Sequence, residues 1–305
     1  MFKLFLDAIS SRLSDSCFYC NAPLKHLTTM RVGGNAACLV EADNVETIKI
    51  VLSAAKEYNV PLLVIGNGSN MVISDDGFEG VVLHLSKEIS AVACDGLRIT
   101  AQAGALLPGI SRIAAENSLT GLEFASGIPG SLGGAVVMNA GAYGGEMKHI
   151  IEDVTVLADG ELKVFTAEEM NFGYRHSLLM EHPDWIVISA TLVLEKGDRR
   201  EIIAKMNDLS ARRREKQPLQ YPSSGSFFKR PEGYFAGALI EQSNLKGFSV
   251  GGAQVSELHA GFVINTGNAT ASDIYQLMHH VQKTVFNNFH VKLEPEVRLI
   301  GRFEK

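Results

Sequence analysis

The chain of 305 residues predicts an α+β fold in two domains, and three observations support this. Segments of alternating apolar and polar residues are mixed along the chain with segments of helical period. Two Asp-Gly pairs, at 95–96 and 159–160, lie between strand-like runs and indicate β-hairpins. Near Gly197 the composition changes, because a segment rich in Arg and Lys begins there. We therefore expect one domain over residues 1–197 and a second over residues 198–305.

The first domain is expected to begin with an amphipathic helix over residues 1–13 and to continue as an extended, loop-like segment over residues 20–35. Asp43 with Glu46 predicts a capping box for a helix that ends before Pro61. Pro108 predicts the start of another helix, which runs through Asn117. Strands are expected at residues 62–65, 81–85, 91–103 (a hairpin), 154–157, 162–165 and 186–194.

The second domain is expected to begin with the Arg/Lys-rich helix, which Pro218 ends. Its apolar periodicity then predicts further elements in a regular order. After the Arg/Lys-rich helix at 198–217 come a Ser/Gly loop at 223–226, a helix at 236–244, a strand at 261–265, a helix at 272–289 and a strand at 297–300.

Composition excludes several classes of protein. A net charge of −6 argues against nucleic acid as the main partner, and no apolar run is long enough to predict membrane insertion. The first helix has neither a positive leader nor a small-residue cleavage site, so it is not expected to be a signal peptide. Four cysteines in a chain of this length do not predict a disulfide framework, and Cys17 with Cys20 lacks a second metal-ligand pair. We therefore expect a cytoplasmic protein without a bound metal.

Two glycine-rich stretches are the strongest local signal. Residues 125–145 are dense in glycine and contain Pro129, which restricts one φ angle, and a smaller loop at 66–70 follows an apolar strand. Glycine lets bare backbone amides approach a ligand, and successive N–H groups form a nest for phosphate oxygens. No G-x-G-x-x-G pattern is present at the start of a helix. The pair of loops predicts a bound pyrophosphate, and two ordinary tight turns remain the alternative.

Five motifs in order resemble the family of UDP-N-acetylenolpyruvoylglucosamine reductases, called MurB. They are GNGSN (66–70), SGIPGSLGGAVVMNAGAYG (126–144), YRHS (174–177), GSFFKRP (225–231) and LEPEVRLIG (293–301). The resemblance covers Thr28 to Gly301. It implies an FAD-binding domain of the vanillyl-alcohol-oxidase/p-cresol-hydroxylase type, made of two α+β subdomains, and a smaller α+β substrate-binding domain. The space between Val250 and Gly261 is too short for the family's Tyr-bearing insertion, so the shorter family type is expected.

The resemblance also implies a reaction and a cofactor. The family reduces UDP-N-acetylglucosamine enolpyruvate to UDP-N-acetylmuramate for peptidoglycan synthesis, with NADPH as co-substrate and non-covalent FAD as the hydride carrier. The implied FAD-binding residues come from both glycine loops. They are Gly66, Asn67, Gly68, Ser69, Asn70, Ser126, Gly127, Ile128, Gly130, Ser131, Gly133, Gly134, Asn139 and Gly141.

Three catalytic residues follow from the same motifs. Arg175 is expected to stabilise charge on the substrate carboxylate, since a guanidinium can bind a carboxylate through two bonds. Ser226 is the implied proton donor to the α-carbon, and Glu296 is expected to orient or polarise the enol. Without the motifs, each of these residues has an ordinary structural interpretation. Arg175 would form an ion pair at a domain interface, Ser226 would be a loop or cap serine, and Glu296 would be a surface carboxylate.

The substrate's diphosphate is expected to meet basic residues. Lys216, Lys229 and Arg230 are the implied contacts, and Tyr174 is expected to stack on or hydrogen-bond the substrate. The Arg-rich end of the helix at 198–217 reads otherwise as a solvated face. His259, His279 and His280 are expected to be partly buried or surface residues without a catalytic role.

Two other functions stay open on the sequence. One is a flavin-dependent oxidase of a small alcohol or hydroxy acid, and the presence of Lys216, Ser226 and Glu296 argues against it. The other is a nucleotide-binding regulatory module that uses the glycine loops for phosphate alone.

Overall fold

The computed structural model describes residues 1–14 and 17–303 of the chain. Contacts between residues divide these into two compact units that alternate along the sequence. The first unit comprises residues 1–20, 38–67 and 80–211, and the second comprises residues 21–37, 68–79 and 212–305. The domain boundary predicted near Gly197 stays a prediction, since these units are defined by contacts and not by independent folding.

The N-terminal half of the chain contains a four-stranded sheet in the order β1-β2-β5-β3. Strands β3 and β5 pair in parallel, with Leu62 opposite Val81, and helix α1 packs against α2. The parallel pairing requires a crossover, because a tight turn joins only antiparallel strands. The bounds are α1 (Phe2–Ser10), β1 (Phe18–Pro23), β2 (Asn35–Ala42), α2 (Val45–Glu57), β3 (Leu62–Ile65) and β5 (Phe78–Leu85).

Two expectations about this region were wrong. The segment expected to be loop-like contains β1, and β2 was not predicted at all. The cap of α2 is Asn44, whose side chain accepts a hydrogen bond from the backbone N–H of Thr47 at 2.9 Å. Asp43 instead accepts a bond from the Thr47 hydroxyl, so the predicted pairing of Asp43 with Glu46 does not form. Adjacent Asp and Asn residues are both good caps, and the sequence offered no way to choose between them.

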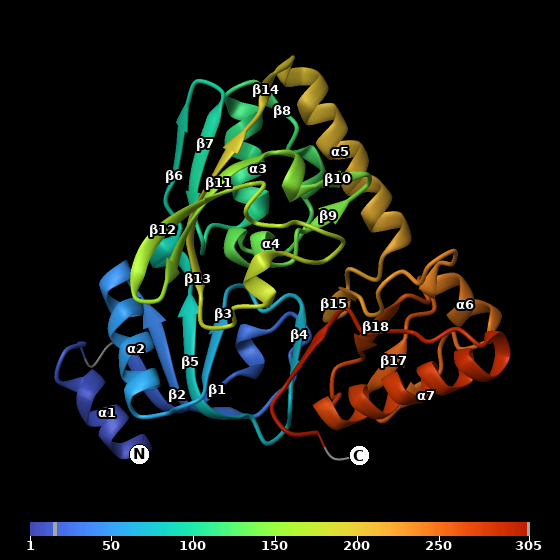
Figure 1. Cartoon of the computed structure of the whole chain (residues 1–305). Helices are drawn as coiled ribbons and strands as arrows, with labels where there is room; N and C mark the ends of the chain where they lie inside the picture. The colour runs from blue at the N-terminus through green and yellow to red at the C-terminus, as the bar shows by residue number, and fades with distance from the viewer. Residues whose placement is uncertain (15–16, 304–305) are drawn as a thin grey trace. The chain divides into compact units, whose positions relative to one another are not determined.

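The first unit also contains a five-stranded antiparallel sheet in the order β12-β11-β13-β7-β6. Both predicted Asp-Gly hairpins are confirmed, one between β6 and β7 and the other between β11 and β12. Helix α4 packs against β13 and β7, and α3 lies beside β6 (Figure 1). The bounds are β6 (Val92–Asp95), β7 (Arg98–Gln102), α3 (Leu107–Glu116), α4 (Leu132–Val137), β11 (Ile151–Ala158), β12 (Glu161–Thr166) and β13 (Ile186–Val193).

Short elements complete this part of the chain. Strand β8 pairs with β14, and β9 pairs with β10, in both cases antiparallel. The strands are β8 (Leu119–Thr120), β9 (Gly141–Ala142), β10 (Gly145–Glu146) and β14 (Glu195–Lys196). The 3-10 turns are η1 (Lys25–Leu27), η2 (Lys87–Ile89), η3 (Glu123–Ala125), η4 (Met147–His149) and η5 (Leu178–Met180).

The second unit is built on an antiparallel sheet in the order β15-β18-β17-β16, which α7 covers. A parallel pair, β4 and β19, places Met71 opposite Arg298. The predicted Ser/Gly loop at residues 223–226 is in fact strand β15. The bounds are β4 (Met71–Ile73), α5 (Arg199–Lys216), β15 (Ser223–Ser226), α6 (Ala236–Gln242), β16 (Ser249–Val250), β17 (Ala253–Val255), β18 (Phe262–Asn265), α7 (Ala271–Phe289) and β19 (Arg298–Ile300).

Each unit has its own apolar core, as the burial of side chains requires. In the first unit, Val40, Leu83 and Val156 are among the side chains with no exposed surface. In the second, Phe227 and the inward face of α7, with Ile274 and Leu277, are fully buried. Among residues 1–14 and 17–303, no helix has the length and apolar character needed to cross a bilayer.

Candidate functional site

Gly66 and Asn67, the first residues of the smaller glycine loop, meet the second glycine loop inside the first unit. The Asn67 side-chain amide donates to the Pro129 carbonyl at 2.6 Å, so the end of one loop is fixed on the other. Gly66 lies so close to Ser131 that an added Cβ would overlap the serine hydroxyl. A side chain at residue 66 would therefore require the Ser131 side chain of the other loop to move.

These loops have the properties needed to hold a diphosphate-bearing cofactor such as FAD. Within the part of the chain that the structure describes, the backbone N–H groups of Asn67 and Gly130 have no acceptor. Gly133 packs against Ala103, with 3.0 Å between the position of an added Cβ and the Ala103 Cβ. Unpaired backbone donors and bare glycine surface are what close approach of phosphate oxygens requires.

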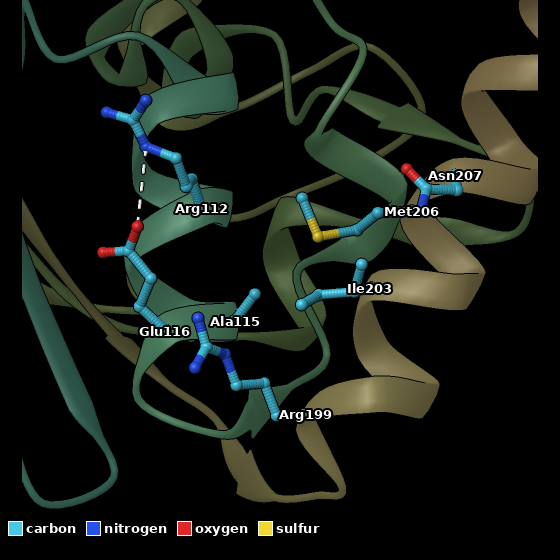
Figure 2. Close-up of a pocket in the computed structure, with 7 residues that line it drawn as sticks. All are labelled: Arg112, Ala115, Glu116, Arg199, Ile203, Met206 and Asn207. Atoms are coloured by element: carbon cyan, nitrogen blue, oxygen red, sulfur yellow. Dashed lines mark ion pairs between the residues drawn. The ribbon is translucent and has the colours of Figure 1, made fainter.

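A cavity of about 760 Å³ opens beside the first loop and includes Gly66 and Asn67 in its wall. The wall also contains His84, whose Nδ1 lies 2.9 Å from an Oε atom of Glu41. A second cavity, of about 270 Å³, lies between α3 and α5 (Figure 2). Arg112 and Glu116 form an ion pair at its edge, and no predicted site residue lines it.

Asn139 has a different position from the one expected for a cofactor contact. It has no exposed surface, and its amide nitrogen donates to Glu146 Oε2 at 2.9 Å and to the Gly173 carbonyl at 2.8 Å. Its Oδ1 accepts from the backbone N–H of Lys148 at 2.9 Å. The side chain therefore joins the hairpin of β9 and β10 to the turn that carries Arg175. Its backbone N–H also donates to the Val136 carbonyl at 3.1 Å, and its role toward a cofactor stays a prediction.

Arg175 is held next to the second glycine loop. Its Nη2 donates to the Gly141 carbonyl at 3.3 Å, and its guanidinium lies 5.1 Å from the centre of the Tyr174 ring. Arg175 has a φ of +53°, a left-handed conformation that is uncommon for a residue other than glycine. Buried Ser177 anchors the same turn, because its hydroxyl donates to the Val137 carbonyl at 2.8 Å. Backbone held in this conformation by its surroundings is frequent at functional sites.

Ser226 and Glu296 lie on adjoining segments of the second unit. Ser226 ends β15 and pairs with Phe262, and the next residue, Phe227, accepts a backbone hydrogen bond from Glu296 N–H at 2.9 Å. A second backbone contact, between Phe228 and Pro295, continues the pairing. Two predicted catalytic residues, distant in sequence, are therefore brought together by one short antiparallel contact.

Asn70 belongs to the first glycine loop and also fixes this segment. Its side-chain amide donates to the Glu296 carbonyl at 3.1 Å, and its own carbonyl accepts from Arg298 N–H at 3.0 Å. Asn70 thus connects the first glycine loop directly to the segment that contains Glu296. Arg175 belongs to the first unit, so its closeness to Ser226 and Glu296 stays a prediction.

The predicted diphosphate-binding cations are all in the second unit. Lys216 is exposed at the end of α5, and Lys229 forms an ion pair with Glu294 at 3.5 Å. The Arg230 guanidinium lies 4.0 Å from the centre of the Phe235 ring. Exposed pairs of this kind are weak, so Lys229 remains available to an anionic ligand.

Glu123 is the clearest buried charge near the second loop, and no sequence motif indicated a role for it. Its side chain has about 2% of its surface exposed, although Glu is seldom buried without partners. Its apolar neighbours Leu122 and Phe124 were a signal that this carboxylate lies inside the fold.

His259 is partly buried as expected, and desolvation lowers its pKa below the ordinary value. In residues 1–14 and 17–303, no group of three or more His, Cys, Asp or Glu could hold a metal ion.

Comparison with known proteins gives consistent results. Residues 36–166 match a family profile described as an FAD binding domain. Residues 217–300 match the profile described as UDP-N-acetylenolpyruvoylglucosamine reductase, C-terminal domain. A UDP-N-acetylenolpyruvoylglucosamine reductase of Clostridium perfringens is 52% identical over 283 residues, which is 92% of each chain.

Solved structures agree with the sequence matches. The reductase of that name, MurB, from Thermus caldophilus has a TM-score of 0.81 at 37% identity and covers 93% of this chain and 98% of its own. Phl p 4, a grass pollen allergen with glucose dehydrogenase activity, has a TM-score of 0.51 at 16% identity over 64% of this chain and 44% of its own. At that identity the likeness shows the fold alone, and the expected FAD-binding domain is supported by the profile match over residues 36–166.

Proposed function

The chain belongs to the UDP-N-acetylenolpyruvoylglucosamine reductase family, and from that premise we propose how its residues carry out the family's reaction. It is an FAD-dependent oxidoreductase of peptidoglycan synthesis that acts on UDP-N-acetylglucosamine enolpyruvate. When bound, FAD supplies the hydride chemistry that connects NADPH with the vinyl carbon of the substrate.

We propose that the two glycine loops hold the cofactor's diphosphate. The unpaired N–H groups of Asn67 and Gly130 support this, because they are donors that no protein acceptor satisfies among the described residues. The packing of Gly66 on Ser131 supports a pre-formed cradle, which needs no rearrangement to receive the phosphates.

Three side chains are proposed to act on the substrate. Hydride addition to the vinyl carbon places negative charge on the carboxylate end, and Arg175 stabilises that charge through its guanidinium. Ser226 then gives its hydroxyl proton to the α-carbon, and Glu296 holds the enol in orientation for that transfer. The backbone bond between Phe227 and Glu296 carries this assignment, because it fixes the donor and the carboxylate on adjoining segments.

The substrate's diphosphate is proposed to bind Lys216, Lys229 and Arg230, with Tyr174 against the sugar or the base. Tyr174 supports this with an aromatic side chain that is about 52% exposed. A cytoplasmic location is also proposed, in keeping with four cysteines that are all free.

An anaerobic spectroscopic titration tests the proposal. The purified protein is expected to show oxidised-flavin absorption, to lose it on addition of NADPH, and to regain it on addition of the enolpyruvyl substrate. Recovery of colour with oxygen alone, and none with the substrate, would indicate an oxidase. A protein that binds nucleotide but no flavin would indicate a regulatory module.

A further inference from the structure

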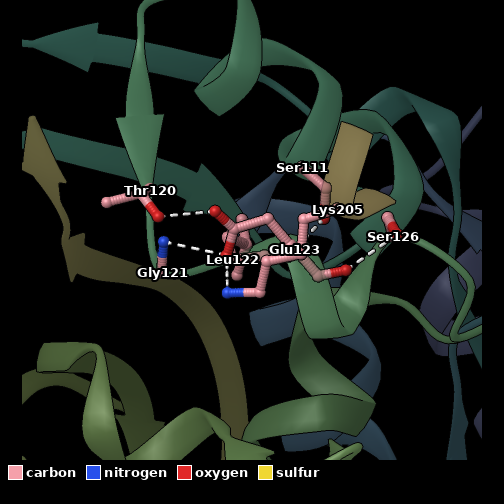
Figure 3. A network of polar contacts seen from close by, with 7 residues as sticks. All are labelled: Ser111, Thr120, Gly121, Leu122, Glu123, Ser126 and Lys205. Carbon is pink, nitrogen blue, oxygen red and sulfur yellow. Dashed lines mark hydrogen bonds and ion pairs between the residues drawn. The ribbon is translucent and has the colours of Figure 1, made fainter. Parts of the chain in front are cut away.

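The 3-10 turn η3 lies directly before the second glycine loop and contains the buried carboxylate of Glu123. The Thr120 hydroxyl donates to Oε1 at 2.6 Å, and the backbone N–H of Gly121 donates to Oε2 at 3.1 Å. Lys205, which α5 contributes, places its Nζ 3.3 Å from Oε2 (Figure 3). The carboxylate therefore accepts from three donors, and one of them, Lys205, also compensates its charge.

These contacts decide the protonation state of Glu123. Burial opposes ionisation, but the bonds from Thr120 and from backbone N–H groups, together with the charge of Lys205, outweigh it and hold the pKa below the ordinary value of 4.5. A buried, ionised and fully bonded carboxylate is rigid, because any movement would leave a charge or a donor without its partner.

The same turn contacts both ends of the second glycine loop. The Glu123 carbonyl accepts hydrogen bonds from the Ser126 hydroxyl at 2.8 Å and from the Ser126 backbone N–H at 3.2 Å. At the far end of the loop, Gly145 packs so tightly on the Phe124 ring that an added Cβ would overlap it. From α3, the Ser111 hydroxyl donates to the Leu122 carbonyl at 3.1 Å (Figure 3).

We propose that Glu123 is a positioning residue, whose bonded carboxylate fixes the turn on which the flavin-binding loop begins and ends. Lys205 compensates its charge, and Thr120 and Gly121 fix its direction. The inference rests on the proposed role of the glycine loops in cofactor binding. It adds that the geometry of the second loop depends on the hydrogen bonds of a buried side chain that lies outside the loop itself.

The test is the dissociation constant of FAD, measured with the holoprotein by the recovery of flavin fluorescence on dilution. Glu123→Ala removes all three bonds, and we expect the dissociation constant to rise by at least about tenfold. Glu123→Gln keeps the shape and can still accept from Gly121 and donate to Thr120, so it should restore most of the affinity. Glu116→Ala, an exposed glutamate on α3, is the matched control and should leave the constant unchanged.

A purely structural role is separated by measuring thermal stability alongside FAD affinity. If Glu123→Ala lowers the unfolding temperature but leaves the FAD dissociation constant within about twofold of the wild type, the inference is wrong. Should Glu123→Ala fail to fold, Thr120→Val removes only the hydroxyl bond and should still weaken FAD binding, and unchanged binding would refute the inference. Failure of the wild type to bind FAD would instead contradict the proposed function, so the two failures are distinguishable.

Discussion

Asn139→Ala is expected to lower the stability of the fold by an amount that the structure allows us to work out. The substitution leaves one part-buried backbone group, the Lys148 N–H, without its partner, whereas the Gly173 carbonyl keeps the bond from His176 N–H at 3.3 Å. An unpaired group of this kind costs about 1–3 kcal/mol, so the free energy of unfolding should fall by about 1–3 kcal/mol. Glu146 loses one donor but keeps Lys148, whose Nζ lies 3.2 Å from it.

The backbone conformation of Asn139 requires a control, because its φ of +42° favours Asn over Ala. Asn171 has a similar φ of +47° and is exposed. Asn171→Ala therefore measures the cost of this conformation without the buried side-chain bonds. The difference between the two variants isolates the contribution of those bonds.

Denaturant unfolding of the holoprotein is the assay, supported by thermal unfolding. A chain of this size loses about 1.5 °C of unfolding temperature for each kcal/mol, so a measurable shift is expected. The unfolding free energy of Asn139→Ala could instead equal that of Asn171→Ala. In that case the buried bonds would contribute nothing, and the reasoning would be refuted.

Three further predictions concern the cofactor loop, the active-site cation and pH. Gly66→Ala should weaken FAD binding by at least about tenfold, because the added Cβ meets Ser131. Gly109→Ala is the control, since the space around Gly109 is open. Equal FAD affinities of the two variants would contradict the proposed role of the two glycine loops in holding the cofactor. Arg175→Lys keeps the charge but loses the bidentate geometry, so turnover should fall by roughly 10²-fold with little change in unfolding temperature. If turnover and unfolding temperature fall together, Arg175 has a structural role. The folded-state pKa of Glu123 lies below its unfolded value, so its ionised form stabilises the fold above about pH 4.5, and this contribution is lost as the pH falls through the folded pKa. The stability difference between wild type and Glu123→Gln should therefore shrink from neutral pH to about pH 3, and a constant difference would contradict the assignment.

Local patterns predicted those features that local chemistry decides. The Asp95-Gly96 and Asp159-Gly160 pairs predicted their hairpins, because a turn with positive φ needs such residues. Pro108 and Pro218 likewise predicted where α3 begins and α5 ends. The regular apolar spacing of α7 predicted where this helix begins and ends to within one residue.

Features that depend on distant partners could not be predicted in this way. The strand at 223–226 has Ser and Gly in place of β-branched residues, and only its pairing with β18 makes it a strand. The backbone bond that brings Glu296 to Phe227 joins segments about seventy residues apart, and no spacing rule contains it. The motifs identified Ser226 and Glu296 by resemblance, and the structure supplies the physical reason that they occur together.

Ser226→Ala, followed in the two half-reactions separately, is the most direct test of the central claim. Bleaching of the flavin absorption by NADPH should proceed as in the wild type, and its recovery with the enolpyruvyl substrate should slow by roughly 10²-fold or more. Ser249→Ala, an exposed serine on β16, is the control and should leave both steps unchanged. An equal loss in both half-reactions of Ser226→Ala, or none in either, would contradict the assignment of Ser226 as the proton donor.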